Sequence, residues 1–213
     1  MVLMNDVYRY IENNYQLNEP IFLSELNIPG MKAVSVRQQL KKLTESGRLK
    51  RFDTGIYYIP KKSMFRSGST LSVDEVIRRK YLTDGENCCG YVGGILFANQ
   101  LGMTTQVPRA YEIYTNKATT EYRETKLANL RVILRKPYCA IDEKNAVMLQ
   151  FLDLLKEIVD ISEVDGEELT NRLISYMKKK SIGFENMRQF LPYYPERIYK
   201  NIYEVGLLNG VSA

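Results

Sequence analysis

The stretch from Met31 to Lys62 constrains the fold most, because its apolar periodicity changes halfway along. In the first half, small and aliphatic residues recur at spacings of three and four, which predicts an amphipathic helix: Ala33, Val36, Leu40 and Leu43. Ser35 is placed to cap this helix, and Gly47 sits just past its end. Four polar residues stand between the apolar ones and should share the outward face: Arg37, Gln38, Lys41 and Lys42.

In the second half of the stretch the period becomes two. Residues 49–53 alternate, Asp53-Thr54-Gly55 supplies a turn, and residues 56–59 resume as a strand before Pro60. A basic helix followed directly by a short basic hairpin is the pattern of a winged helix-turn-helix, whose second helix enters the DNA major groove. The preceding chain fits this order, with a helix over 2–14, an extended piece at 20–22, a brief helix at 23–26 and a turn at 27–30.

The positive charge of the chain is concentrated on the same segment. The net charge is +5, and residues 30–66 hold ten Lys and Arg against two acids, whereas residues 67–213 hold nineteen of each. A basic excess on one module is the electrostatic footprint of nucleic-acid binding. The alternative is a solvated surface that happens to be basic.

The expected fold class is α+β, with a winged helix-turn-helix DNA-binding domain at 1–66 and a mixed α/β C-terminal domain at 67–213. The polar residues 67–69 mark the boundary. The second domain should combine a small antiparallel sheet with several helices. We expect its strands at 111–115, 122–126 and 130–134, with a turn at 128–129, and its helices at 72–82, 91–101, 143–159, 167–180 and 195–208.

Several classes of protein are disfavoured by composition. Histidine is absent, which removes His-based catalysis and His-containing zinc sites. Three cysteines, two of them adjacent, form no metal or disulfide framework, and we expect neither metal nor cofactor. Asp74-Glu75 after a Gly-Ser step lacks the second acid pair of a nucleotidyltransferase, so no enzyme activity is expected. The N-terminus lacks a signal peptide and residues 87–108 are too polar to span a membrane, so the protein is expected in the cytoplasm, with no membrane partner.

The candidate DNA-binding residues lie on the helix and the hairpin. Arg37 and Gln38 carry the side chains that pair with guanine and adenine edges, and Lys41 and Lys42 are suited to phosphates. The complete predicted set is Lys32, Ser35, Arg37, Gln38, Lys41, Lys42, Lys50, Arg51, Thr54, Lys61 and Lys62. The alternative is an ordinary soluble surface.

Three further groups have a functional and a structural interpretation. A basic stretch in the second domain is a possible secondary surface for nucleic acid or a partner, or else a solvated β face: Arg109, Lys117, Arg123, Lys126, Arg131 and Arg135. A second group is either a functional surface or a helix end whose buried backbone groups are hydrogen-bonded: Asn99, Gly102, Thr105 and Gln106. Tyr193, Tyr194, Tyr199 and Tyr203 either pack in the core or bind a partner through the C-terminal helices.

A longer motif lies at 93–108, GGILFANQLGMTTQVP. It contains an Asn-x-Leu-Gly step at Asn99 and a Thr-Gln-x-Pro segment at Thr105, and Tyr114-Thr115 follow it. Together with the Gly-Ile-Tyr-Tyr-Ile-Pro hairpin at 55–60, these features resemble the AbiEi family of antitoxins over roughly residues 5–140. The resemblance implies a winged helix that binds inverted repeats in double-stranded DNA of its own promoter. It also implies that the protein represses its own operon and that 67–213 is an antitoxin or regulatory domain. This domain would counter a nucleotidyltransferase-like toxin without a tight complex, in abortive infection by phage. The alternative function is a non-DNA-binding interaction module that uses its C-terminal helices.

Overall fold

The computed structural model describes residues 3–62 and 69–208, and side chains from residue 6 onward. Helices and small sheets are mixed along the chain, so the fold class is α+β. The chain forms two compact units, Met1–Arg79 and Lys80–Ala213.

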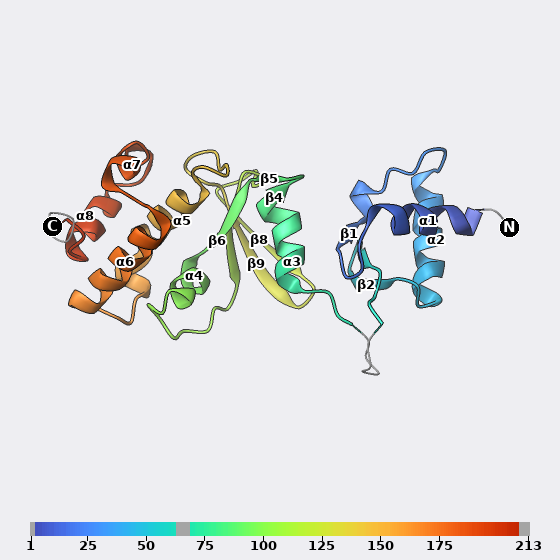
Figure 1. The fold of residues 1–213 in the computed structure, drawn as a ribbon, viewed down its shortest axis with the longest axis horizontal. Coiled ribbons are helices and arrows are strands. Elements are labelled where there is room, and N and C mark those ends of the chain that lie inside the picture. Colours follow the sequence, from blue (N-terminus) through green and yellow to red (C-terminus); the bar gives the residue numbers. More distant parts are fainter. Residues whose placement is uncertain (1–2, 63–68, 209–213) are drawn as a thin grey trace. The chain divides into compact units, whose positions relative to one another are not determined.

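The first unit contains helices α1 (Leu3–Asn14) and α2 (Ala33–Glu45), the one-turn 3-10 helix η1 (Leu23–Glu25), and strands β1 (Ile21–Phe22), β2 (Lys50–Asp53) and β3 (Ile56–Tyr58) (Figure 1). The strands pair antiparallel in the order β1-β3-β2. Both helices place an apolar stripe in one core, as their periodicity predicted. Ala33 is the exception, because it lies in the first turn of α2 to one side of the buried stripe and is exposed. The buried members of that core are Val7, Ile11, Ile21, Leu26, Val36, Leu40, Leu43, Leu49 and Ile59. The predicted helix–short helix–helix–hairpin order is confirmed.

The predicted cap of α2 is wrong. The N-cap position is Lys32, whose side chain makes no capping hydrogen bond, and Ser35 lies within the first helical turn. The helix begins earlier than a cap at Ser35 would place it. Pro29 and Gly30, with Gly30 at φ +77°, end the preceding turn, so residues 33–35 can already be helical.

The predicted boundary at 66/67 lies within residues 63–68, outside the described part of the chain, as do Ser67 and Gly68 of the predicted linker. The first unit extends further, to Arg79, and includes α3 (Val73–Ile77). Arg79 joins this end of the unit to its earlier residues, because its guanidinium donates to the carboxylates of Glu19 and Glu25. A π-helical turn, η2 (Arg78–Leu82), continues α3, so the helix predicted at 72–82 is confirmed.

The second unit is organised on a four-stranded sheet. Its strands are β6 (Gly90–Gly93), β7 (Tyr111–Thr115), β8 (Tyr122–Leu127) and β9 (Leu130–Arg135), in the order β6-β7-β9-β8. Two short strands, β4 (Thr83–Asp84) and β5 (Asn87–Cys88), pair separately. The three predicted strands are confirmed.

The prediction of a purely antiparallel sheet is wrong, because β7 and β9 are parallel. A two-residue turn at Ala128 and Asn129 makes β8 and β9 antiparallel neighbours, with Ala128 at φ +51°. The chain leaves β7, passes to the sheet edge as β8, and returns as β9 between the two. Strand β9 therefore runs in the direction of β7.

The helix predicted at 91–101 is also partly wrong. Tyr91 and Val92 belong to β6, and the helix α4 (Gly94–Gln100) begins only at Gly94. Gly94 has φ +60°, a left-handed conformation that a helix cannot continue through. The strand then pairs with β7 through Gly93 and Glu112, which the helical periodicity of 95–101 concealed.

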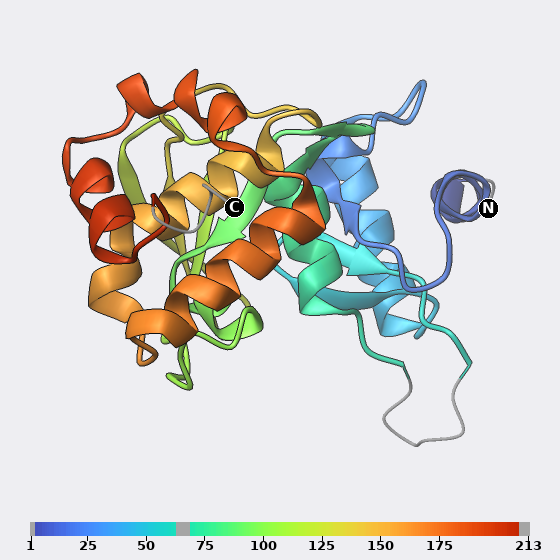
Figure 2. The same ribbon diagram turned by 60° about the vertical axis from the view of Figure 1, so that its left-hand side comes forward.

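The remaining helices of this unit are α5 (Ala146–Ile161), α6 (Gly166–Lys180), α7 (Phe184–Arg188) and α8 (Arg197–Glu204), with a 3-10 turn η3 (Leu191–Tyr193). Helix α5 lies across one face of the sheet (Figure 2), and Gln150 on α5 donates a hydrogen bond to the Val92 carbonyl at 2.8 Å. Neither α7 nor η3 was predicted. No helix in the described ranges combines the length and apolarity needed to cross a membrane.

Candidate nucleic-acid interface

The solvent face of α2 carries the predicted recognition residues. Val36, Leu40 and Leu43 are buried, which turns the opposite side of the helix to solvent. Arg37, Gln38, Lys41 and Lys42 are all exposed there. The helical period therefore brings these four side chains together on one accessible surface.

Two residues that were not predicted also lie on this face. Val34 is 61% exposed in the first turn, although it is apolar. Glu45 lies at the last turn, and its carboxylate is 3.8 Å from the ammonium of Lys41. A helical wheel drawn over 33–45 would have found both, since they follow the spacing of Arg37 and Lys41. The charge of this face is therefore less positive than the lysine count indicated.

The hairpin between β2 and β3 is held by its own polar residues. Arg51 Nη2 donates to Thr54 Oγ1 at 3.0 Å, and Arg51 Nε donates to the Asp53 carbonyl at 3.2 Å. The Thr54 amide donates to Asp53 Oδ1 at 2.6 Å. Arg51 and Thr54, both predicted and both exposed, thus form one preorganised turn.

The other predicted residues differ in exposure. Lys32, Lys61 and Lys62 are exposed, and the backbone of Lys61 is fixed by the Asn18 side chain, 3.1 Å from its amide. Ser35 and Lys50 are partly buried. The Lys50 ammonium donates to the Ser69 carbonyl at 3.4 Å, which makes it the least available cation of the set.

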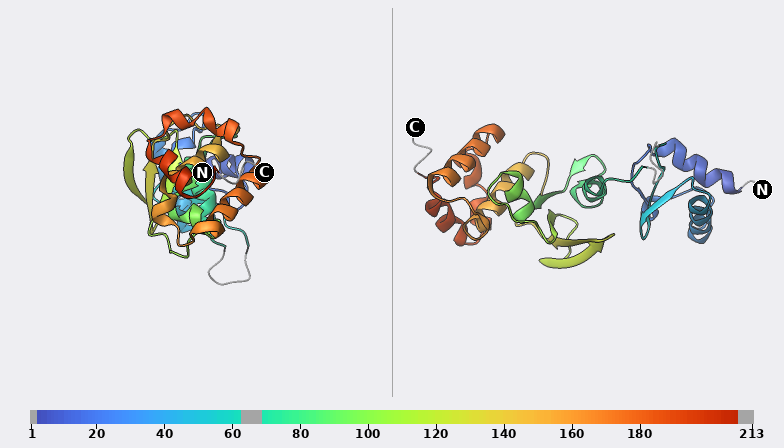
Figure 3. Two further views of the ribbon diagram at one scale, coloured as in Figure 1. Left: turned by 90° about the vertical axis from the view of Figure 1, so that its left-hand side faces the viewer. Right: turned by 90° about the horizontal axis from the view of Figure 1, so that it is seen from below.

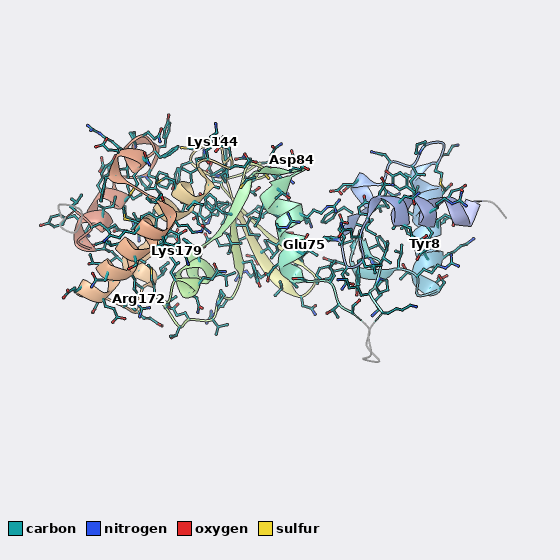
Figure 4. The ribbon with its side chains drawn as sticks, viewed as in Figure 1. Tyr8, Glu75, Asp84, Lys144, Arg172 and Lys179 are labelled. Atoms are coloured by element: carbon teal, nitrogen blue, oxygen red, sulfur yellow. The ribbon has the colours of Figure 1, made fainter. Side chains whose placement is uncertain are left out.

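Arg48 is a further cation on this unit. Its guanidinium lies 5.2 Å from the ring centroid of Tyr8 on α1, which is labelled in Figure 4. A cation over an aromatic face is held by the ring quadrupole. Arg48 therefore serves the packing of α1, and its sequence position beside Gly47 gave no signal of this.

Half of the predicted secondary surface is committed to partners within the second unit. The Arg131 guanidinium bonds both carboxylate oxygens of Glu124 at 2.6 and 2.7 Å, and Arg135 Nε bonds Glu112 at 2.5 Å. Lys117 donates to the carbonyls of Lys80 and Thr83. Figure 3 shows the hairpin of β8 and β9 that carries most of this surface.

The remaining cations of that surface are Arg109, Arg123 and Lys126, which are exposed and form no salt bridge within the described ranges. Glu112, Glu121 and Glu124 each pair with a cation of the same stretch. Among its described residues, the surface thus offers three cations outside salt bridges and backbone contacts, where six were predicted.

The Thr-Gln-x-Pro segment is hydrogen-bonded to the loop that follows α5. The amide and hydroxyl of Thr105 both donate to one oxygen of Glu163, at 2.5 and 2.8 Å. The hydrogen bond from this amide lowers the pKa of the Glu163 carboxyl. Gly102 ends α4 at φ +69°, and Asn99 donates to the Gln106 carbonyl at 3.3 Å. These contacts favour the structural interpretation of the segment.

A buried polar cluster on α5 was missed by the sequence analysis. Asp153, 3% exposed, accepts hydrogen bonds from Tyr91 at 2.5 Å and from the Lys156 ammonium at 3.1 Å. Burial raises the pKa of Asp153 to about 6, and the charge of Lys156 opposes that rise. Lys156 also contacts the Tyr114 hydroxyl at 3.1 Å. In the sequence, Asp153 is an acid within the apolar run of 151–155, a pattern typical of a residue on the exposed side of an amphipathic helix.

Comparison with known proteins places the chain in a family. Residues 18–182 match DUF6088, described as a family of unknown function. The chain belongs to this family. No curated protein matches it. The matched DUF6088 region includes α2, the hairpin of β2 and β3, the four-stranded sheet, α5 and α6, so both units contribute to the family's common part.

Within the described part of this DUF6088 chain, no group of three or more Cys, Asp or Glu side chains has the arrangement of a metal site. Glu45 on α2 pairs with Lys41, and Glu112, Glu121 and Glu124 pair with cations of the second basic surface and the neighbouring Lys136. The arrangement that stands out is the exposed basic face of α2 together with the preorganised hairpin.

Proposed function

We propose that the first unit is a winged helix-turn-helix that binds double-stranded DNA, with α2 in the major groove and the β2–β3 hairpin along the backbone. The observation that carries the proposal is the joint exposure of Arg37, Gln38, Lys41 and Lys42 on one face of α2. In this class of protein the recognition helix presents such a face to base edges.

The residue types assign different roles within that surface. Arg37 has the planar fork that pairs with guanine, and Gln38 has the amide that pairs with adenine. Phosphate contacts suit Lys41, Lys42, Arg51 and Thr54, and also the exposed Lys32, Lys61 and Lys62. Phosphate contacts fix the register of the protein on the duplex, whereas Arg37 and Gln38 supply sequence preference.

We further propose that the protein represses its own operon and acts as antitoxin to a nucleotidyltransferase-like toxin. The likeness of the 93–108 motif and of the 55–60 hairpin to AbiEi antitoxins supports this role. Binding to an inverted repeat requires two copies of the DNA-binding unit, with half-sites about 34 Å apart, or a multiple, on one face of the duplex.

The test of DNA binding uses the full chain and fluorescence anisotropy with the duplex upstream of its reading frame, against a shuffled duplex. We expect tight binding to the first alone, with an affinity that falls steeply as salt rises. Lys41→Ala/Lys42→Ala should weaken binding to both duplexes, since it removes phosphate contacts. The matched control, Lys178→Ala/Lys179→Ala, removes two exposed lysines of α6 (Lys179 is labelled in Figure 4) and should bind as the wild type does. Equal affinity of all three proteins would contradict the proposal.

The antitoxin role is tested in cells. A nucleotidyltransferase-type reading frame beside this gene should arrest growth when expressed alone, and co-expression of this chain should restore growth. Rescue by the Lys41→Ala/Lys42→Ala variant would separate neutralisation from DNA binding. Growth arrest that persists in the presence of the folded wild-type chain would exclude the antitoxin role.

The alternative is a protein-interaction module that does not bind DNA. It is supported by three exposed tyrosines in the C-terminal part, Tyr193 at 62%, Tyr199 at 48% and Tyr203 at 72% exposure, whereas Tyr194 is buried. Aromatic residues are enriched in protein interfaces. Weak binding to every duplex, without preference for the upstream sequence, would favour this alternative.

A further inference from the structure

We propose that Val34 reads the methyl group of a thymine in the bound DNA, and so determines specificity at one base pair. This inference rests on the proposed DNA-binding function and adds one specific contact to it. Its starting point is the exposure of an apolar side chain where the fold gives that side chain nothing to pack against.

The first observation is the position of Val34 relative to the core. The apolar stripe of α2 is formed by Val36, Leu40 and Leu43, and all three are at most 2% exposed. Val34 lies outside that stripe and is 61% exposed. In the described part of the first unit, Leu17 is the other large apolar side chain of high exposure, at 51%, and it lies outside the helices. The exposure of Val34 therefore has no structural role in α2.

The second observation is what surrounds Val34 on its own helix. Residues three and four apart share a helix face, so Val34 lies beside Arg37 and Gln38. These two are the side chains suited to base edges, and both are exposed. Lys41, Lys42 and Glu45 follow towards the C-terminal end. Along the helix, this face therefore begins with an apolar side chain, continues with the two side chains suited to base edges, and ends with charged residues.

The chemistry of the major groove provides a partner for each part of this face. Thymine is the one standard base that presents a methyl group there, and apolar side chains contact it. Recognition helices of this class place their N-terminal residues at the base edges. Val34, in the first turn, is therefore at the end of α2 that meets the bases.

Helical geometry fixes the register of the contact. Val34 precedes Arg37 by about 4.5 Å and Gln38 by about 6 Å along the helix axis, at 1.5 Å per residue. Successive base pairs are about 3.4 Å apart. The thymine contacted by Val34 should thus lie within two base pairs of the guanine or adenine read by Arg37 or Gln38.

The test combines a change in the protein with a change in the DNA. Each thymine of the footprinted upstream site is replaced singly by deoxyuridine, which lacks only the methyl group, and the dissociation constant is measured by anisotropy. For the wild type we expect a loss of about fourfold at one position, the effect of one buried methyl-sized group. For Val34→Ala we expect weaker binding to the thymine duplex and no further loss with deoxyuridine at that position.

The matched control is Val159→Ala, the same substitution at an exposed valine on α5, 47% exposed, in the other unit. It should keep the wild-type response to deoxyuridine. Circular dichroism melts of both variants establish that each is folded. A Val34→Ala variant that retains the deoxyuridine response would overturn the inference, as would specific wild-type binding that is indifferent to every thymine methyl. Absence of sequence-specific binding by the wild type would instead refute the proposed function, and the inference with it.

Discussion

Glu45 provides a quantitative test of where α2 meets DNA. Its carboxylate lies on the same face as the predicted contacts, 3.8 Å from the Lys41 ammonium, and both side chains are well exposed, at 63% and 78%. If this face lies against phosphates, Glu45 neutralises one cation that would otherwise displace counterions. Glu45→Gln should then increase the affinity for DNA.

The size of this increase follows from counterion release. Each additional phosphate contact steepens the slope of log affinity against log salt by about 0.9. Between 1 M and 0.1 M salt, one additional contact multiplies the affinity by about eight. If the two proteins bind equally at 1 M salt, Glu45→Gln should therefore bind about eightfold more tightly than the wild type at 0.1 M. The substitution should hardly change folding, since an exposed pair of this spacing contributes only about 0.3–0.5 kcal/mol.

The assay is an anisotropy titration of the upstream duplex at four salt concentrations between 50 and 300 mM. The matched control is Glu204→Gln on α8, which removes the acid of a similar pair, Lys200 with Glu204 at 3.4 Å and four residues apart. The control should leave both slope and affinity unchanged. A Glu45→Gln protein with wild-type slope would show that α2 does not face the phosphates, and an equal gain in the control would show a nonspecific effect of net charge.

Three further predictions concern stability. Leu40→Ala at a fully buried position should lower the free energy of unfolding by about 2–5 kcal/mol in a urea titration, and a loss below about 1 kcal/mol would contradict the assigned core. Gly94→Ala should lower the melting temperature, because φ is +60° and an added Cβ would meet the Glu112 side chain; an unchanged melt would refute this. Folding raises the pKa of the Asp153 carboxyl from 3.8 to about 6, so the folded protein binds the carboxyl proton more tightly than the unfolded chain does. The stability that this proton contributes is therefore lost as pH rises from about 4 to above 6. Relative to Asp153→Asn, the wild type should therefore lose about 2 kcal/mol of unfolding free energy between pH 4 and pH 7, at about 1.4 kcal/mol per pKa unit; parallel pH profiles would refute the assignment.

The sequence predicted the first unit well because its signals are local. The three- and four-residue spacing of Val36, Leu40 and Leu43 fixes which side of α2 is buried, and therefore which side is exposed. The turn at residues 53–55 likewise fixes the hairpin. What the pattern could not give was the availability of each cation, since the pairing of Lys50 with the Ser69 carbonyl depends on a residue distant in sequence.

The second unit was predicted less well because its pairing is nonlocal. The parallel neighbours β7 and β9 are separated by β8 in the chain, and no local pattern encodes that order. The strand β6 was hidden because its four residues adjoin a helical apolar run without a polar break. The partners of Arg131 and Arg135 were unforeseen for the same reason, since a charge count does not reveal which acids face which cations across strands.

Helix α8 covers one side of α5 with residues that lie outside the family match. Asn201 on α8 donates its amide to the carbonyls of Leu155 and Lys156 on α5, at 2.8 Å each, and Ile198 and Ile202 complete the core behind them. These residues lie beyond the part of this chain that matches the family, residues 18–182. A chain cut after residue 182 would expose to water the side of α5 that α8 covers, together with the apolar residues on that side. Helix α8 therefore completes the core of the second unit from outside the matched region.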